Sequence, residues 1–173
     1  MPDSIDHVDF VVSQWNTVVP EVDVQAMQVA SRLFRMGTVA GRDVERLFKQ
    51  YGLTQGEFDV LATLYRAGAP YTLCPQNLIE ALLLSSGAMT NRLDRLEQAG
   101  LIRRFPNAQD RRGVNVSLTD SGLHAAHSSL VGYLGELERI LAPLDTNERA
   151  TMASLLKKLL VPHDITCRGG ISP

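Results

Sequence analysis

Cysteine is scarce in this sequence, with only Cys74 and Cys167 among 173 residues. Two cysteines make a poor disulfide framework, and we expect both to be free thiols in a reducing compartment. No apolar run approaches the length needed to span a bilayer. The first ten residues hold three aspartates and no Lys or Arg, which excludes a signal or transit peptide. We therefore expect a cytoplasmic protein with no membrane partner.

The residue patterns of an enzyme are also missing. There is no glycine-rich phosphate loop and no Cys, His and Asp grouping with nucleophile spacing. Of the four scattered histidines, His124 and His127 lie three residues apart and could share a metal ion, but a solvated helix face is the favoured interpretation. We predict a protein that is not an enzyme and needs no cofactor or metal.

Positive charge is concentrated in one segment of an otherwise acidic chain. The net charge of −2 alone argues against nucleic-acid binding. Residues 85–112, however, contain six arginines and three acidic residues, which leaves 11 basic and 16 acidic residues elsewhere. Because phosphate binding depends on the local field more than on the total charge, this distribution predicts a DNA-binding segment.

Hydrophobic periodicity and capping residues predict a mainly helical chain with a small β-hairpin. Asp3 and Ser4 are expected to cap a first helix that runs to about Val18. Further helices are predicted over residues 24–51, 54–67, 76–83, 88–99, 120–141 and 146–160, and strands over 101–105 and 114–118. A tight Ser/Gly turn between two short helices, followed by a hairpin, indicates a winged helix-turn-helix.

We divide the chain accordingly into four parts. Residues 1–53 and 121–161 are assigned to dimerisation helices, because their apolar faces exceed what one small lobe can bury. Residues 54–120 are assigned to a winged helix-turn-helix DNA-binding lobe, and residues 162–173 to a flexible tail.

Helical spacing gives residues 86–99 a buried side and an exposed side. The apolar residues expected in the core are Met89, Leu93 and Leu96. The opposite side carries Ala88 for close approach, Asn91, whose amide can pair with adenine, and Arg95, whose guanidinium can pair with guanine or phosphate. In isolation this pattern fits an ordinary surface helix, but its coincidence with a wing and a basic segment favours DNA reading.

The tip of the predicted wing is the run Asp110-Arg111-Arg112-Gly113. An arginine there can enter a narrow minor groove, and Asp110 is expected to orient an arginine by ion pairing. A solvated charged turn is an equally good interpretation of this run alone. Two serines before the helix lie at its positive end, where backbone N–H groups can hold a phosphate. The predicted DNA-binding residues are Ser85, Ser86, Ala88, Thr90, Asn91, Arg95, Asp110, Arg111 and Arg112.

Several ordered motifs resemble those of the MarR family over roughly residues 24–160. They are Gly52-Leu53-Thr54-Gln55-Gly56-Glu57-Phe58-Asp59-Val60-Leu61, Leu84-Ser85-Ser86-Gly87-Ala88-Met89-Thr90-Asn91-Arg92-Leu93-Asp94-Arg95-Leu96-Glu97, Gly100-Leu101-Ile102-Arg103-Arg104, Asp110-Arg111-Arg112-Gly113-Val114 and Leu118-Thr119. The resemblance implies a homodimer with interlocked terminal helices, a recognition helix in the major groove, a wing in the minor groove and a pseudopalindromic operator. The family's wing signature, Asp-x-Arg, falls on Asp110 and Arg112. Repression rather than activation also rests on this resemblance.

A narrower resemblance, to the urate-responsive branch of the family, comes from an additional N-terminal helix that bears Trp15. It implies a small-molecule effector bound by Trp15, Asp59 and Arg92. An anionic ligand could compete for Arg92 within an Asp59–Arg92 ion pair. Several members carry an arginine just after the tryptophan, whereas residues 16–19 here are uncharged, so an aromatic carboxylate or another aromatic or anionic molecule stays open. A core role for Trp15 and a structural salt bridge for the other two residues are the alternatives.

Two rival functions remain for the winged unit. One is thiol-based redox sensing through Cys74, although no Lys, Arg or His near it in sequence would depress its pKa. The other is a winged helix used only for protein contacts.

Overall fold

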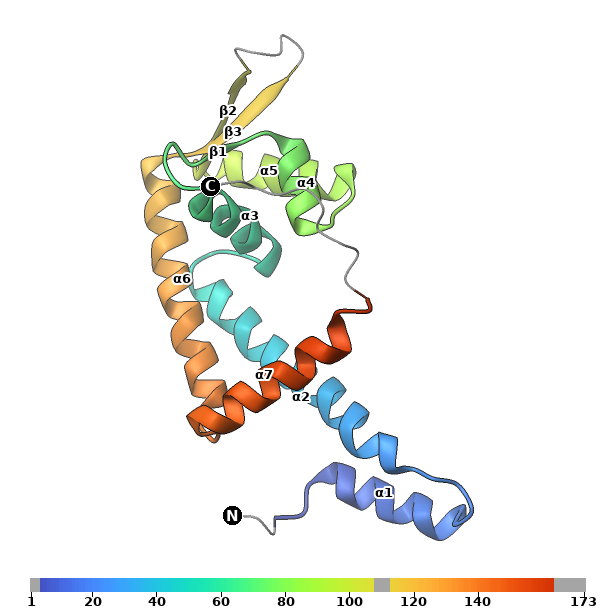
Figure 1. Cartoon of the computed structure of the whole chain (residues 1–173). Coiled ribbons are helices and arrows are strands. Elements are labelled where there is room, and N and C mark those ends of the chain that lie inside the picture. The colour runs from blue at the N-terminus through green and yellow to red at the C-terminus, as the bar shows by residue number, and fades with distance from the viewer. Residues whose placement is uncertain (1–3, 108–112, 164–173) are drawn as a thin grey trace. The chain divides into compact units, whose positions relative to one another are not determined.

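The computed structural model describes residues 4–107 and 113–163 (Figure 1). The chain forms two compact units, Met1–Val44 and Glu45–Pro173. Within the described residues the elements are seven helices and three short strands. The predicted fold class, mainly α with a small β wing, is confirmed. None of the helices in these described stretches is long and apolar enough to cross a membrane.

The first unit consists of helix α1 (His7–Val18) and the first part of helix α2 (Gln25–Gln50). Asp6 caps α1 by accepting hydrogen bonds from the backbone N–H groups of Val8 (2.7 Å) and Asp9 (3.0 Å), and the Asp9 carboxylate accepts one from the Asp6 N–H. The prediction that Asp3 or Ser4 caps this helix is wrong, because Asp6 has an acidic partner three residues on and forms a reciprocal capping box.

The second unit contains a lobe of three helices, α3 (Gln55–Arg66), α4 (Pro75–Leu82) and α5 (Ser86–Gln98). Thr54 and Glu57 form a capping box at the start of α3. The core of this unit is apolar, and its fully buried side chains include Phe48, Leu61, Leu64, Leu78, Met89, Leu96, Ile102 and Val116. Burial of such a cluster supplies most of the free energy that holds the three helices together.

A three-stranded antiparallel sheet follows the lobe, in the order β1-β3-β2. Strands β2 (Ile102–Pro106) and β3 (Val114–Leu118) form the predicted hairpin, with Arg104 opposite Val116. Strand β1 (Thr72–Leu73) pairs with β3 and was not predicted from the sequence. Two residues are too few to show a period, so only the pairing reveals this strand.

Helices α6 (Asp120–Leu141) and α7 (Thr146–Leu160) end the described chain, capped by Thr119 and Asp145. Figure 1 shows α6 extending away from the sheet, and its first part packs on α3. Both helices leave large apolar side chains open to solvent, and these are Val131, Leu134, Leu155, Leu159 and Leu160. Single-chain packing therefore leaves an apolar face on the C-terminal helices uncovered.

Candidate nucleic-acid interface

The helix-turn-helix is formed by α4, a short turn and α5. Leu83 ends α4 in the left-handed conformation (φ 52°), and Ser85 caps α5 by accepting a hydrogen bond from the Ala88 N–H. Helix α5 therefore begins at Ser86, two residues earlier than predicted. A serine hydroxyl satisfies one of the free N–H groups of the first turn, which explains why the Ser-Ser-Gly run starts the helix instead of preceding it.

The two sides of α5 are divided as predicted. The side chains buried against the lobe are Met89, Leu93 and Leu96. Asn91, Thr90 and Arg95 are exposed on the other side, and Ala88 is half-buried beside them. The two serines at the helix start, Ser85 and Ser86, are also exposed. An amide, a hydroxyl and a guanidinium are thus presented on one polar helix face.

The two arginines of this helix are both attached to the first turn of α3. Arg95 Nε lies 3.0 Å from Glu57 Oε1, and Arg92 Nη1 donates to the Gly56 carbonyl at 3.3 Å. A Cβ on Gly56 would lie 2.5 Å from Cζ of Arg92, so the absence of a side chain at Gly56 permits this close approach. Neither contact is predictable from the local sequence, because 36 and 38 residues separate the partners.

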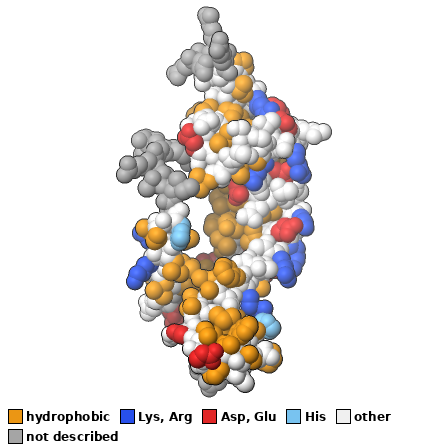
Figure 2. Space-filling view, turned by 90° about the vertical axis from the view of Figure 1, so that its right-hand side faces the viewer, with side chains coloured by type: hydrophobic (Ala, Val, Ile, Leu, Met, Phe, Trp, Pro, Cys, Tyr) orange, Lys and Arg blue, Asp and Glu red, His pale blue; other side chains and the backbone are white. Residues whose placement is uncertain are grey.

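Not every arginine of the basic segment is available to a phosphate. Arg104 Nη2 lies 2.6 Å from Asp94 Oδ1, and its Nε lies 3.6 Å from Glu97 Oε2. Arg103 is exposed instead, with its guanidinium 5.8 Å from the centre of the Phe105 ring. Figure 2 shows Lys and Arg side chains beside Asp and Glu side chains on the visible face of this lobe. Fewer arginines are therefore free to bind phosphate than the number of arginines in residues 85–112 suggests.

The tip of the wing lies outside the described residues, and with it the predicted contacts of Asp110, Arg111 and Arg112. The described part of the hairpin ends with a hydrogen bond from the Asn107 N–H to the Gly113 carbonyl, at 2.9 Å. The described pairing of the two strands therefore ends at Asn107 and Gly113.

The predicted ligand residues are divided between the two units. Trp15 belongs to the first unit and is 45% exposed, whereas Asp59 and Arg92 belong to the second. Among the described residues, no ion pair within 4.0 Å joins Asp59 to Arg92, so the direct salt bridge is not formed. Burial raises the pKa of Asp59, and the charges of Arg92 and Arg66 oppose that rise. The three-residue ligand site stays a prediction from the family resemblance.

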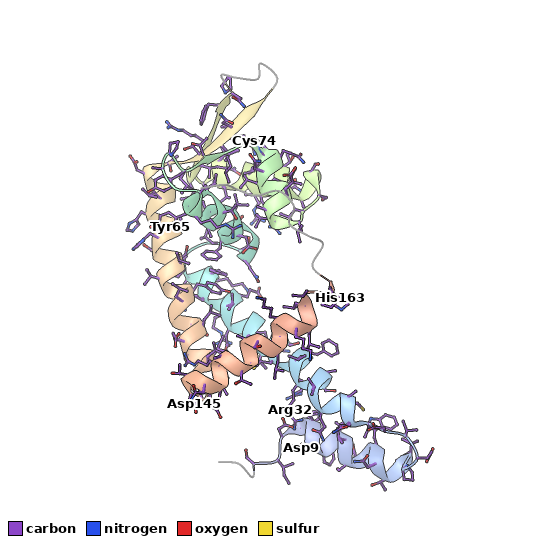
Figure 3. The ribbon with its side chains drawn as sticks, in the orientation of Figure 1. Asp9, Arg32, Tyr65, Cys74, Asp145 and His163 are labelled. Carbon is purple, nitrogen blue, oxygen red and sulfur yellow. The ribbon has the colours of Figure 1, made fainter. Side chains whose placement is uncertain are left out.

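Cys74 and the two histidines considered for a metal site lie outside α5. Cys74 precedes α4, and its Sγ donates to Oδ1 of Asn77 at 2.8 Å (Figure 3). His127 is hydrogen-bonded through Nδ1 to the hydroxyl of Tyr65 at 3.1 Å, and His124 lies 3.5 Å from the Ser128 hydroxyl. In the described part of the chain no group of three His, Cys, Asp or Glu side chains is positioned to hold a metal ion.

A helix-turn-helix with an exposed polar helix face, followed by a hairpin wing, defines the winged-helix class of DNA-binding proteins. Residues 53–114 match the model of the MarR family. The chain is 38% identical to the HTH-type transcriptional regulator PecS of Dickeya dadantii, over 88% of this chain and 92% of that protein. It is 34% identical to the multiple antibiotic resistance protein MarR of Escherichia coli, over 74% and 90% of the two chains. The chain belongs to the MarR family, whose members are DNA-binding transcriptional regulators and not enzymes.

Solved structures agree with this assignment. The fold matches that of a mutant MarR from Escherichia coli in complex with operator DNA, with a TM-score of 0.67 and 26% identity over 84% of this chain and 97% of that one. It also matches MepR from Staphylococcus aureus in a DNA complex, with a TM-score of 0.69 and 26% identity over 78% of this chain and 98% of that one.

Proposed function

We propose that this protein is a dimeric, sequence-specific repressor that leaves a pseudopalindromic operator when it binds a small aromatic or anionic ligand. The observation that carries the DNA-binding part is the polar face of α5, where Asn91, Thr90 and Arg95 are exposed while the opposite face is buried. A helix of this kind fits the major groove, and an Asn amide and an Arg guanidinium match the donor and acceptor patterns of adenine and guanine. The exposed serines at its start would hold a phosphate.

A second copy of the chain is the proposed cover for the apolar face of α6 and α7. Val131, Leu134 and Leu155 are each more than half exposed in the single chain. A monomer rarely leaves large contiguous apolar surface open, and a two-fold dimer would bury the same patch on both copies. Such a dimer would present two copies of α5 to the duplex. In this proposal residues 1–53 and 121–161 form the dimer interface, and residues 54–120 bind DNA.

The DNA-binding proposal is tested by salt dependence and by base preference. Affinity for operator duplex should fall steeply with salt, with a log–log slope of about −0.9 per neutralised phosphate. Asn91→Ala should relax base preference at one position, whereas Arg112→Ala, at the wing tip, should weaken binding to all duplexes alike. Wild-type operator affinity and base preference in both variants would contradict the proposed reading surface. A weak salt response would instead favour a protein-contact role.

The effector is proposed to contact Trp15, Asp59 and Arg92. An indole offers a flat stacking face and one N–H donor. Within the described residues the guanidinium of Arg92 forms one hydrogen bond, to the Gly56 carbonyl at 3.3 Å, so an anionic ligand would compete for it at little cost. Because Arg92 lies on α5, its movement would alter the DNA-reading helix. A coupling of about 1–3 kcal/mol between the two sites would change operator affinity about 5- to 150-fold.

Thermal shift with urate, salicylate-like acids, indole acids and small polycarboxylates tests the effector, since a ligand that binds the folded state raises Tm. An active compound should release the operator from the wild type and fail to release it from Trp15→Ala. This variant leaves the DNA-reading helix intact, unlike Arg92→Ala. A normal ligand response of Trp15→Ala would remove the proposed site.

A further inference from the structure

Glu57 of α3 has a buried carboxylate that contacts Arg95 on the exposed face of α5. Its side chain is only 8% exposed, whereas the side chain of its partner Arg95 is 67% exposed. Glu57 Oε2 accepts two hydrogen bonds from Thr54, one from the backbone N–H at 2.7 Å and one from the hydroxyl at 2.9 Å. The other oxygen, Oε1, forms an ion pair with Nε of Arg95, at a distance of 3.0 Å. Thr54 thus fixes the carboxylate in the orientation that serves the arginine.

This contact uses one edge of the guanidinium and leaves the other edge open. Nε is the guanidinium atom of Arg95 nearest to the Glu57 carboxylate, and within the described residues its two terminal nitrogens form no hydrogen bond. A guanidinium presents its donors in a rigid plane, so an ion pair at Nε restricts the directions open to the two Nη groups. They form a paired donor edge of the kind that binds a phosphate or the O6 and N7 of guanine bidentately.

We propose that Glu57 is a positioning residue for DNA recognition, which holds the guanidinium of Arg95 ready to bind the operator. The inference rests on the proposed reading surface of α5. Immobilising a long side chain on binding costs about 0.5–1.5 kcal/mol, so an arginine ordered beforehand gains about two- to tenfold in affinity. Glu57 itself is buried and does not touch DNA.

The test compares operator affinity in four proteins: wild type, Glu57→Gln, Arg95→Ala and the double variant. Glutamine retains the capping interaction with Thr54 but has no charge for Arg95. Glu57→Gln should weaken operator binding about two- to tenfold with wild-type Arg95 present, and should not weaken it further in the Arg95→Ala background. A structural role would lower affinity equally in both backgrounds, and that outcome would overturn the proposal.

Removing any negative charge from the lobe strengthens DNA binding through the long-range field, so a matched control is needed. Glu80→Gln removes one negative charge at an exposed position of α4, where Glu80 accepts a hydrogen bond from Gln76. Operator affinity of Glu57→Gln should fall below that of Glu80→Gln, and equal or higher affinity would overturn the proposal. If Glu57→Gln fails to fold, Arg95→Lys tests the paired donor edge of Arg95, without which Glu57 has nothing to position. A lysine keeps the charge near Glu57 without a paired donor edge, so its operator affinity should fall about tenfold while Tm stays unchanged. Wild-type affinity of Arg95→Lys would overturn the proposal.

Failure of this inference differs from failure of the proposed function. If Arg95→Ala binds the operator like the wild type, Arg95 is not part of the reading surface, and Glu57 has nothing to position. If Arg95→Ala is impaired but Glu57→Gln matches Glu80→Gln, the reading surface stands and only the positioning role of Glu57 is lost.

Discussion

Arg104 of β2 is bound to Asp94 of α5, with Nη2 and Oδ1 2.6 Å apart. The backbone N–H of Arg104 also donates to Glu97, at 2.9 Å. Arg104 therefore connects the hairpin to α5, although it has the same charge as Arg103 and is adjacent to it in the sequence. Neighbouring arginines in this segment have different roles because alternate residues of a strand face opposite sides.

Replacing each of these arginines by glutamine should separate the two roles. Arg103→Gln removes an exposed charge and should reduce the log–log salt slope of duplex binding by about 0.9, the value for one phosphate. Arg104→Gln should leave that slope unchanged and cost about 1 kcal/mol of stability, seen as a Tm lower by about 2–4 °C. Fluorescence anisotropy with labelled duplex at several salt concentrations and thermal unfolding measure the two effects. A reduced slope for Arg104→Gln with unchanged Tm would contradict the assignment.

Sequence reasoning was accurate where one periodic signal dominates. The buried set Met89, Leu93 and Leu96 follows from spacing alone, and it places the polar face of α5. The contacts of Glu57 with Arg95 and of Asp94 with Arg104 join residues that are distant in sequence, and local pattern does not reveal such pairings. Strand β1 was missed for the same reason, because it exists only through its pairing with β3.

The attachment of α1 to α2 depends on Arg32. Its guanidinium lies 2.8 Å from Asp6 and 2.7 Å from Asp9, and Figure 3 shows Arg32 and Asp9 facing each other. Trp15 is the single tryptophan of the chain and lies in α1, so its fluorescence reports on this helix alone. Arg32→Gln should increase the mobility of α1 and lower the anisotropy of Trp15. The matched control is Arg35→Gln, one turn further along α2, which should leave the anisotropy unchanged; equal effects of the two substitutions would contradict the role of Arg32.

Low pH should also weaken the contact between α1 and α2. The hydrogen bond from the Asp9 N–H, together with the nearby Arg32, holds the pKa of Asp6 below its ordinary value of 3.8. A carboxyl whose pKa is lowered on folding stabilises the fold above 3.8, and this stabilisation is lost as the pH falls through the lowered pKa. A titration from pH 5 to about pH 2 should therefore lower Trp15 anisotropy in the wild type. Arg32→Gln should show a smaller change, and an identical acid response in both proteins would contradict this explanation.

Asp59 should respond to pH with the opposite sign. Its burial raises its pKa, so the folded protein disfavours the ionised carboxylate, and the stability associated with this group is greatest below pH 3.8 and is lost as the pH rises through the raised pKa. Asp59→Asn should consequently raise Tm at pH 7, with a gain that fades toward pH 3.5. Glu45, whose pKa is lowered by Lys49, provides the comparison, because Glu45→Gln should lower Tm at pH 7. A lower Tm for Asp59→Asn at neutral pH would show that its attraction to Arg92 and Arg66 outweighs its burial.

Gly122, in the first turn of α6, is required by the packing of this helix on the end of α5. The hydroxyl of Thr119 donates to the carbonyls of Gly100 (2.7 Å) and Leu101 (3.2 Å), and this brings the helix so close that a Cβ on Gly122 would lie 1.8 Å from the Leu101 oxygen. Because that oxygen belongs to the backbone, Gly122→Ala should cost about 3 kcal/mol, or a Tm lower by about 6–12 °C. Gly135→Ala, in the same helix, meets no atom within 4 Å and should gain about 0.5–1 kcal/mol from helix propensity. Thermal and urea unfolding measure both changes, and a loss of stability at both positions would show that α6 responds to side-chain volume in general and not to the contact with Leu101.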